Sequence, residues 1–428
     1  MTSTPGPRSI LVSRRLLVGL GVIFVAPWLL LLVAIRDLSS ANRPHEHAAS
    51  PAQTPVPAVS NPSEEGLIEA KAGPWGHLLY TRILIEPPED LVARNQQSNL
   101  PVRWSFAGYT PSGLTELWQA AQLPATVVAE LNAPDNRTYA GDRTEIRVRH
   151  QIINELSPEA RATIYEVLAR FPENELHVEP FRFRADAVDE WFNDSGVPPA
   201  TIDRVKRLLY RRGPAVLFSD LEVVLAQIPS LEERTRLIKT LARKSTLLVR
   251  LVLDEQSDLD TLADYWGRGQ RSKDVRPLLQ SLRRKGSASR IDIAHLLPRF
   301  ARARLYSYPS TSGAEHSLEF MDCHWTAMNF FKLEPDPRFQ DINVVSMTLL
   351  GDYRQVTGRS ELGDILLFAR QDGSIAHSCV YIADDIVFTK NGTSPASPWI
   401  LMNLPDVLAI YPSKEPFDIQ RYRLKTLD

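Results

Sequence analysis

The feature that most constrains this chain is an unbroken apolar run from Leu16 to Ile35, which reads LLVGLGVIFVAPWLLLLVAI. Twenty helical residues rise about 30 Å, the thickness of the hydrocarbon core of a bilayer. Arg36 behind the run is offset by Asp37, whereas the residues before it include Arg8, Arg14 and Arg15. By the positive-inside rule, this predicts a single-pass signal-anchor at residues 16–35 with its amino terminus in the cytoplasm.

A cleaved signal peptide is the competing interpretation of this run. Small residues at Ser39, Ser40 and Ala41 could serve a peptidase. The run is longer than the roughly 7 to 15 apolar residues of a signal peptide, which favours the anchor. We expect the anchor to lie in the inner membrane. Under either interpretation, the bulk of the chain is expected to be periplasmic or otherwise extracytoplasmic.

The 428 residues are too many for one ordinary core and suit several domains. Residues 36–65 are rich in Pro, Ala and Ser and poor in large apolar side chains, which predicts a disordered linker. The linker contains a weak chelating pattern, His45-Glu46-His47. Since the chain has two cysteines and neither a C-x-x-C pair nor an H-E-x-x-H run, we expect no metal site and no cofactor.

Residues 66–155 mix two patterns and predict a small α+β module. The segments from His77 to Pro87 and from Thr144 to Arg149 have the β-branched, partly alternating composition of strands. The segments from Leu114 to Ala121 and from Ala125 to Leu131 are typical of helices.

Residues 156–305 predict an all-α helical domain. Ser157, Pro158 and Glu159 supply an N-cap, a first-turn proline and a first-turn acid. We expect further helices at 200–212, 219–227, 230–243, 259–266, 273–285 and 291–303. Residues 201–305 hold about 22 Lys and Arg against about 12 Asp and Glu, so this region could contact an anionic surface. Nucleic acid is not expected as a partner, because the location and motifs both argue against it.

Residues 306–428 predict an α+β domain with a small antiparallel sheet. Cys323 lies in MDCHWTAMNFF, at the start of an expected helix. Three consecutive strands are expected after it, at 364–368, 377–382 and 386–389, with turn residues between them. A cysteine at a helix start is thus followed by a strand that opens with His377.

This order of residues points to nucleophilic chemistry. A free thiol has a pKa of about 8.5, and a helix amino terminus or a neighbouring imidazolium lowers it. Cys323 has the first, and His377 could supply the second. A third group must accept the other ring N–H of the histidine. Asn391 or Thr389 can do so, and we favour Asn391 because its amide oxygen is the better acceptor. Backbone N–H groups at the helix start could form an oxyanion hole.

Other roles for these side chains stay open. Cys323 and Cys379 could form a structural disulfide in an oxidising compartment, or both could be buried core residues. Cys379 is the poorer nucleophile because a strand offers no helix dipole. We expect His324 to point away along the helix. His316 lies in an expected loop, and we do not expect it to act in the site. Lys390 and Trp399 could line the pocket, although a tryptophan is more often packed in a core.

The combination of D-C at a helix start, G-D-I-L-L-F at 363–368 and H-S-C-V-Y-I at 377–382 resembles the NlpC-type cell-wall cysteine peptidases and their CHAP amidase relatives. The resemblance covers about the last 120 residues. It implies a papain-like core, Cys323 as nucleophile, His377 as base and a polar residue on the next strand as orienter. The implied activity is hydrolysis of peptide bonds in peptidoglycan stems. The chain departs from the family pattern at D-C-H-W, where D-C-S-G is usual, and at Cys379, where glycine is usual.

We therefore expect a membrane-anchored thiol hydrolase that cuts an amide bond through an acyl thioester, with peptidoglycan or another envelope amide as substrate. The alternative is a catalytically inactive envelope protein whose degenerate domain binds wall or lipid components and acts as a scaffold.

Overall fold

The computed structural model of the chain describes residues 66–92, 102–185, 187–213, 215–283, 288–309, 321–411, 413 and 415–427. The expected anchor at 16–35, the expected linker at 36–65, the His45-Glu46-His47 pattern and His316 all lie outside these residues. Among the helices that are described, none is long and apolar enough to cross a membrane.

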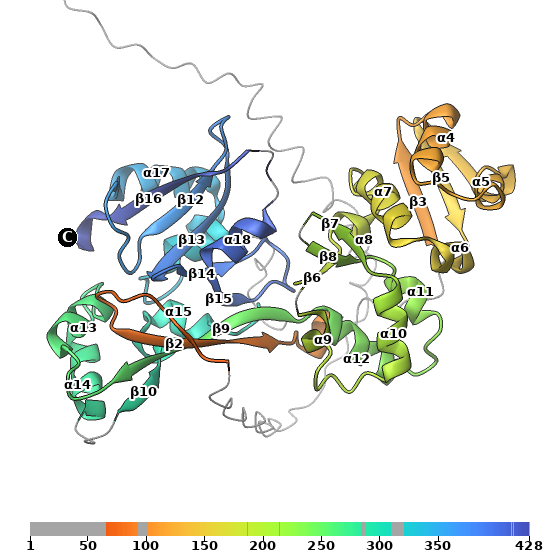
Figure 1. Cartoon of the computed structure of the whole chain (residues 1–428). Coiled ribbons are helices and arrows are strands. Elements are labelled where there is room, and N and C mark those ends of the chain that lie inside the picture. The colour runs from red at the N-terminus through yellow and green to blue at the C-terminus, as the bar shows by residue number, and fades with distance from the viewer. Residues whose placement is uncertain are drawn as a thin grey trace, which may run out of the picture.

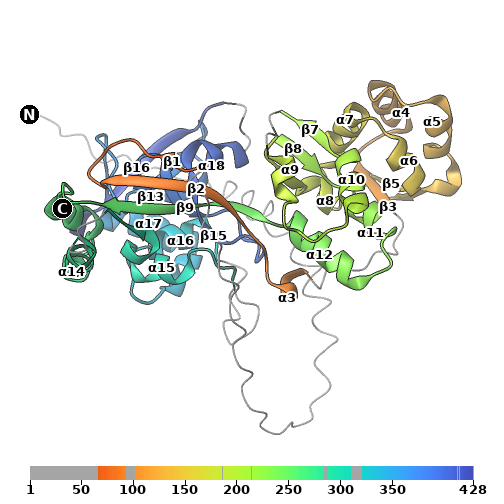
Figure 2. The same cartoon turned by 60° about the horizontal axis from the view of Figure 1, so that its bottom comes forward.

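The described chain is α+β, and its strands form small antiparallel sheets (Figure 1). Its buried apolar side chains fall into two clusters. The C-terminal core draws on residues 70–80, 247–305 and 321–407. The central core draws on residues 92–241. The views in Figures 1 and 2 both show two lobes that correspond to these cores.

Two sheets build the C-terminal core. The larger has the order β11-β16-β12-β13-β14-β15, with bounds Tyr353–Gln355, Asp418–Leu424, Ile365–Ala369, Ile375–Ala383, Ile386–Lys390 and Trp399–Asn403. The smaller has the order β1-β2-β9-β10, with bounds Ile68–Glu69, His77–Ile85, Lys244–Leu253 and Ser289–Asp292. Thr246 of β9 joins the two sheets, because its hydroxyl donates to the carbonyl of Leu401 on β15 at 3.0 Å and accepts from the same residue's N–H at 3.1 Å.

Two three-stranded sheets build the central core. One has the order β3-β5-β4, with bounds Val102–Ala107, Arg143–Val148 and Arg137–Ala140. The other has the order β6-β8-β7, with bounds Phe181–Phe183, Ala215–Phe218 and Tyr210–Arg212.

The helices divide between the cores in chain order. Those of residues 89–241 are α3 Glu89–Val92, α4 Pro111–Ala120, α5 Ala125–Leu131, α6 His150–Glu155, α7 Pro158–Leu168, α8 Glu175–Val178, α9 Val188–Trp191, α10 Pro199–Arg207, α11 Leu221–Leu225 and α12 Leu231–Leu241. Those of residues 259–410 are α13 Leu259–Trp266, α14 Ser272–Arg283, α15 Arg299–Arg304, α16 Cys323–Asn329, α17 Ile342–Asp352 and α18 Leu404–Ile410.

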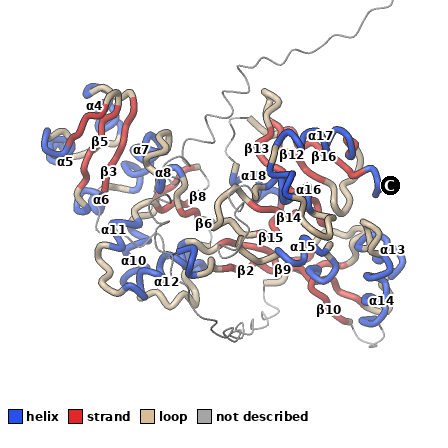
Figure 3. Tube along the Cα trace, turned by 180° about the vertical axis from the view of Figure 1, so that it is seen from behind, coloured by secondary structure: helices blue, strands red, loops and turns tan. Residues whose placement is uncertain are grey.

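The expected all-α region at 156–305 is wrong. Most of its expected helices occur, but the one expected at 291–303 is broken into a 3-10 turn and the short helix α15. Strands β6 to β10 lie among the helices, as the red segments of Figure 3 show. The missed strands β6 to β8 have only three or four residues each, too few to display a period. The long strand β9 is one of the two central strands of its sheet and reads KSTLLVRLVL, a nearly continuous apolar run that periodicity alone does not assign.

The two cores also cut across the expected boundary at residue 155. Strand β2 pairs along its whole length with β9, from His77 opposite Val252 to Ile85 opposite Lys244. Residues 77–85 therefore pack with the C-terminal core, while residues 102–155 pack with the central core.

The strands expected at 364–368, 377–382 and 386–389 are confirmed as β12, β13 and β14, antiparallel and adjacent. The G-D pair before β12 has a structural role. Gly363 has a φ of +91°, and a Cβ there would overlap the ring of Phe331. Asp364 is fully buried and accepts two hydrogen bonds of 2.8 Å from the guanidinium of Arg423 on β16. This ion pair joins β16 to the start of the neighbouring strand β12.

Candidate active site

Cys323 is the first residue of α16. The Asp322 carboxylate caps the helix by accepting the Trp325 N–H at 2.7 Å, which places the cysteine at the helix start. The cysteine is 7% exposed, and α16 packs against β13 and β14. The sheet that carries His377 therefore forms the wall behind the thiol.

His377 lies on β13 and is fully buried. The ring of Tyr411 stacks on its imidazole at a centroid distance of 4.4 Å, and the ring of Phe368 meets it edge-on at 5.2 Å. Its Nε2 lies 2.9 Å from the Thr389 hydroxyl. Its Nδ1 is buried and makes no hydrogen bond among the described residues.

The third member of the site is Thr389, with Asn391 behind it. The Thr389 hydroxyl donates to Oδ1 of Asn391 at 3.2 Å, so it must accept its other hydrogen bond from the Nε2–H of His377. These two hydrogen bonds assign the proton of the neutral His377 imidazole to Nε2. The lone pair is then on Nδ1, where it can accept a proton from a thiol.

The strand register explains this arrangement. Val380 on β13 is paired with Phe388 on β14, and moving three residues along each strand would set Asn391 opposite His377. Strand β14 ends at Lys390, however, and the residue that reaches the ring is Thr389. Our expectation that Asn391 contacts the imidazole directly is wrong, and the alternative left open, Thr389, makes that contact.

The thiol is electrostatically coupled to two imidazoles. Burial raises the pKa of Cys323, but the positive charges of His324 and, next, of His377 outweigh burial and bring this pKa well below the usual value. The helix has only seven residues, so the imidazoles rather than the helix dipole account for the lowering. The lowered pKa favours the thiolate form of Cys323.

His324 does not point away from the site, contrary to expectation. Its Nδ1 lies 3.0 Å from the hydroxyl of Ser378, the residue after His377 on β13. Burial lowers the pKa of His324, yet the negative charge of Cys323 raises it overall to about 9. Two features of the sequence could have indicated this position: His324 directly follows Cys323, and Ser378, which carries a hydroxyl, directly follows His377.

The two cysteines are both free, so the disulfide alternative is wrong. Cys379 is 1% exposed, and burial, together with the negative charge of Cys323, raises its pKa. Cys379 is therefore a protonated core residue, and Cys323 is the nucleophilic candidate.

Lys390 is a further buried charge beside the thiol. Its ammonium donates to the carbonyls of Gly392 at 2.9 Å and Ser394 at 3.0 Å, and it lies 6.0 Å from the ring centre of Trp399. Burial lowers its pKa to about 8, while the negative charges of Cys323 and Asp322 act in the opposite direction. Lys390 thus adds positive charge near the thiolate without acting as orienter.

Three neighbouring residues, Asp322, Cys323 and His324, have potential metal-ligand atoms within 4.8 Å of one another, and no other such group of three occurs among the described residues. The Asp322 carboxylate is already engaged as the helix cap. We therefore assign no metal to these side chains.

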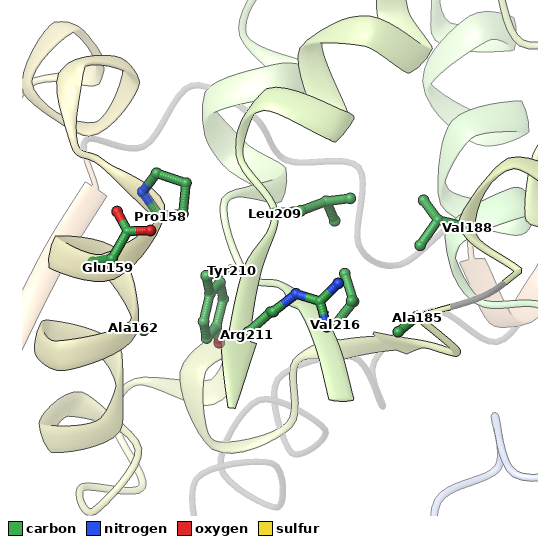
Figure 4. A pocket seen from close by; sticks show the side chains of 9 residues that line it. All are labelled: Pro158, Glu159, Ala162, Ala185, Val188, Leu209, Tyr210, Arg211 and Val216. Atoms are coloured by element: carbon green, nitrogen blue, oxygen red, sulfur yellow. The ribbon is translucent and has the colours of Figure 1, made fainter. Parts of the chain in front are cut away.

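A cavity of about 410 Å³ lies in the central core, between α7 and strands β7 and β8 (Figure 4). Its lining is mainly apolar, with Glu159 and Arg211 as the charged side chains, and it includes no cysteine or histidine. This cavity is therefore separate from the Cys323 site.

Comparison with known proteins gives no relative: no family model, no curated protein and no solved structure matches the chain.

Proposed function

We propose that this protein is a thiol hydrolase that cuts an amide bond, with Cys323 as nucleophile and His377 as general acid and base. The observation that carries the proposal is the ordered set of Cys323 at the start of α16, His377 on the adjacent strand and the Thr389 hydroxyl on the far side of the imidazole. This set contains a nucleophile, a base and an orienting group, which together define this class of site.

The reaction proceeds in two steps. The Cys323 sulfur attacks the carbonyl carbon of the amide, the C–N bond breaks, and the imidazolium of His377 gives its proton to the departing amine. Water then attacks the resulting thioester while His377 takes a proton from it, and the C–S bond breaks. The products are an amine and a carboxylic acid, and the thiolate is restored.

The substrate class rests on resemblance. The D-C, G-D-I-L-L-F and H-S-C-V-Y-I motifs resemble those of NlpC-type cell-wall peptidases, which favours stem peptides of peptidoglycan as the amide substrate. The apolar run at 16–35 and the linker at 36–65 support a membrane-anchored, periplasmic location, where that substrate occurs.

Burial of the site supports a second candidate function, an envelope binding protein without activity. His377 is fully buried, Cys323 is 7% exposed and the Tyr411 ring covers the imidazole. A site closed in this way fits a domain that has kept its fold and lost substrate access.

The full chain in detergent can decide between these functions. Purified peptidoglycan is incubated with the protein, and new amino groups are counted. We expect their release by the unaltered chain and its loss in Cys323→Ala and in His377→Gln. Equal release by all three chains, or none from any envelope amide offered, would favour the binding protein. Mass spectrometry after brief alkylation at pH 7 adds a readout independent of substrate, with rapid modification of Cys323 expected.

A further inference from the structure

A second imidazole, His324, lies beside the thiol, and it has its own supporting hydroxyl. The two histidines act on Cys323 from different elements: His324 from the first turn of α16, where a ring nitrogen lies within 4.8 Å of the Cys323 sulfur, and His377 from β13. Each ring has one nitrogen within hydrogen-bonding distance of a hydroxyl, at 3.0 Å from Ser378 for His324 and at 2.9 Å from Thr389 for His377. The supports differ in position, so the two rings are held independently.

We propose that His324 is a second catalytic residue, a fixed imidazolium that holds Cys323 as a thiolate, with Ser378 as its positioning residue. This inference rests on the proposed function and deepens it. Under this proposal His324 supplies the positive charge beside the sulfur and His377 transfers protons, two tasks that a single catalytic histidine can also perform.

The hydrogen bonds support this division of labour. The Thr389 hydroxyl takes the Nε2–H of His377 and passes its own hydrogen to Asn391, which leaves Nδ1 of His377 as a proton acceptor. The Ser378 hydroxyl can accept from an Nδ1–H of His324, which suits a ring that carries a proton on both nitrogens. His377 can therefore exchange protons while His324 keeps its charge.

The surrounding charges agree with a protonated His324. The Asp322 carboxylate and the Cys323 thiolate both favour the charged ring, and its pKa of about 9 keeps it protonated at neutral pH. The remaining titratable groups that face the thiol from the packed elements are Cys379 on β13, Lys390 on β14 and Tyr411 after α18. Of these only Lys390 can carry a positive charge, and its carbonyl contacts point it toward the loop at 392–394.

The experiment measures the ionisation of Cys323 without any substrate. The rate of iodoacetamide alkylation of Cys323 in the full chain is followed from pH 4 to pH 10 by mass spectrometry, in detergent, for His324→Gln, Ser378→Ala, Ser378→Thr and His377→Gln. The matched control is His150→Gln in the central core, a partly exposed histidine like His324. Circular dichroism melting verifies that each variant is folded.

We expect His324→Gln to move the alkylation midpoint upward by at least about one pH unit, which lowers the thiolate fraction about tenfold below the midpoint. Ser378→Ala should produce a smaller upward shift and Ser378→Thr should restore the midpoint, because threonine keeps the hydroxyl. His150→Gln should leave it unchanged.

The outcomes separate this inference from the proposed function. A midpoint unchanged in folded His324→Gln but raised in His377→Gln overturns the role of His324 and leaves the hydrolase proposal intact. Midpoints unchanged in both variants overturn both. A shift in His324→Gln that Ser378→Ala does not share supports the imidazolium and removes Ser378 from the argument. If His324→Gln fails to fold, the comparison of Ser378→Ala with Ser378→Thr decides: a shift that only alanine produces supports the inference, and equal midpoints overturn it.

Discussion

The pKa values of His177 in the central core and of His324 in the C-terminal core move in opposite directions. Burial lowers the pKa of His177 in the central core to about 3, and the positive charge of Arg212 adds to this effect. Burial also acts on His324 in the C-terminal core, but the neighbouring Cys323 reverses the outcome and raises the pKa to about 9. Burial alone makes a neutral histidine, whereas burial beside an ionisable acid makes a charged one.

A second comparison concerns Asp220, a buried acid of the central core, and His377 of the C-terminal core. In the central core, Asp220 is buried and receives hydrogen bonds from the Arg161 guanidinium at 2.9 Å and from the Tyr165 hydroxyl at 2.5 Å. Both donors also belong to the central core, so these three side chains form a structural network within that core. In the C-terminal core, Nδ1 of His377 is buried without a hydrogen bond among the described residues, which leaves a place for chemistry. Buried side-chain atoms without a hydrogen bond also occur among the described residues of the central core, among them Nε2 of His177 and Nε1 of Trp104. The missing bond therefore singles out His377 only together with its coupling to the Cys323 thiol.

Removing the arginine of the central network tests this contrast with the largest expected effect. Arg161→Met should lower the free energy of unfolding by about 3 to 5 kcal/mol, because Asp220 would be left buried without its cation. Urea unfolding of the full chain measures the change. Arg103→Met is the control, since Arg103 is exposed and 3.7 Å from Glu145, and it should cost at most about 1 kcal/mol. Similar losses in the two variants would contradict the structural role of the buried pair.

Acid should reveal the neutral His177. Since the folded-state pKa is about 3 and the unfolded value is near 6.5, the unfolded chain binds a proton that the folded chain does not. His177 therefore lowers stability as pH falls from 6.5 toward 3, by up to about 1.4 kcal/mol per pH unit. Asp220 acts the other way as its pKa is raised by burial to about 6, so the unaltered chain shows only the balance.

The contribution of His177 is isolated by comparing the unaltered chain with His177→Gln. Urea unfolding at pH 7.0, 5.5 and 4.5 should show the variant gaining stability relative to the unaltered chain at each step down. Parallel curves across this range would mean that folding does not lower the pKa of His177.

The third comparison concerns the orienting side chain of His377. Thr389→Val removes the hydroxyl that accepts the Nε2–H and keeps the side-chain shape, so we expect about a tenfold fall in amide hydrolysis, equivalent to one lost hydrogen bond of about 1.4 kcal/mol. Asn391→Ala should have a smaller effect, because Asn391 contacts the ring only through Thr389. A larger fall in amide hydrolysis in Asn391→Ala than in Thr389→Val would mean that Asn391, and not Thr389, is the main orienting residue of His377.

The smallest effect is expected at Cys379. Because burial raises its pKa, brief alkylation at pH 7 should modify one thiol per chain, and Cys379→Ala should leave both that count and the rate nearly unchanged. Modification of two thiols would show that Cys379 is reactive as well as Cys323. Loss of labelling in Cys379→Ala would place the reactive sulfur on the strand instead of the helix.

Much of the site could be predicted because its signals are local. The acid before Cys323 is an N-cap, the run after it is a helix, and the three strands that follow have turn residues between them. These features depend on residues a few positions apart, so the sequence displays them directly. The choice between Thr389 and Asn391, and the contact of His324 with Ser378, could not be decided from the sequence, because they depend on where β14 ends and on how α16 is rotated against β13.

By itself the sequence determined the helix that begins at Cys323, the three strands β12, β13 and β14, and the order in which the cysteine comes before the histidine. Only the tertiary structure decided that β2 crosses to pair with β9, that the two thiols stay unbonded, and that a second imidazole reaches the sulfur. The reason is physical: local hydrogen bonding and side-chain period fix an element, whereas its partners follow from packing between residues that lie far apart in the sequence, such as His324 and Ser378 or strands β2 and β9.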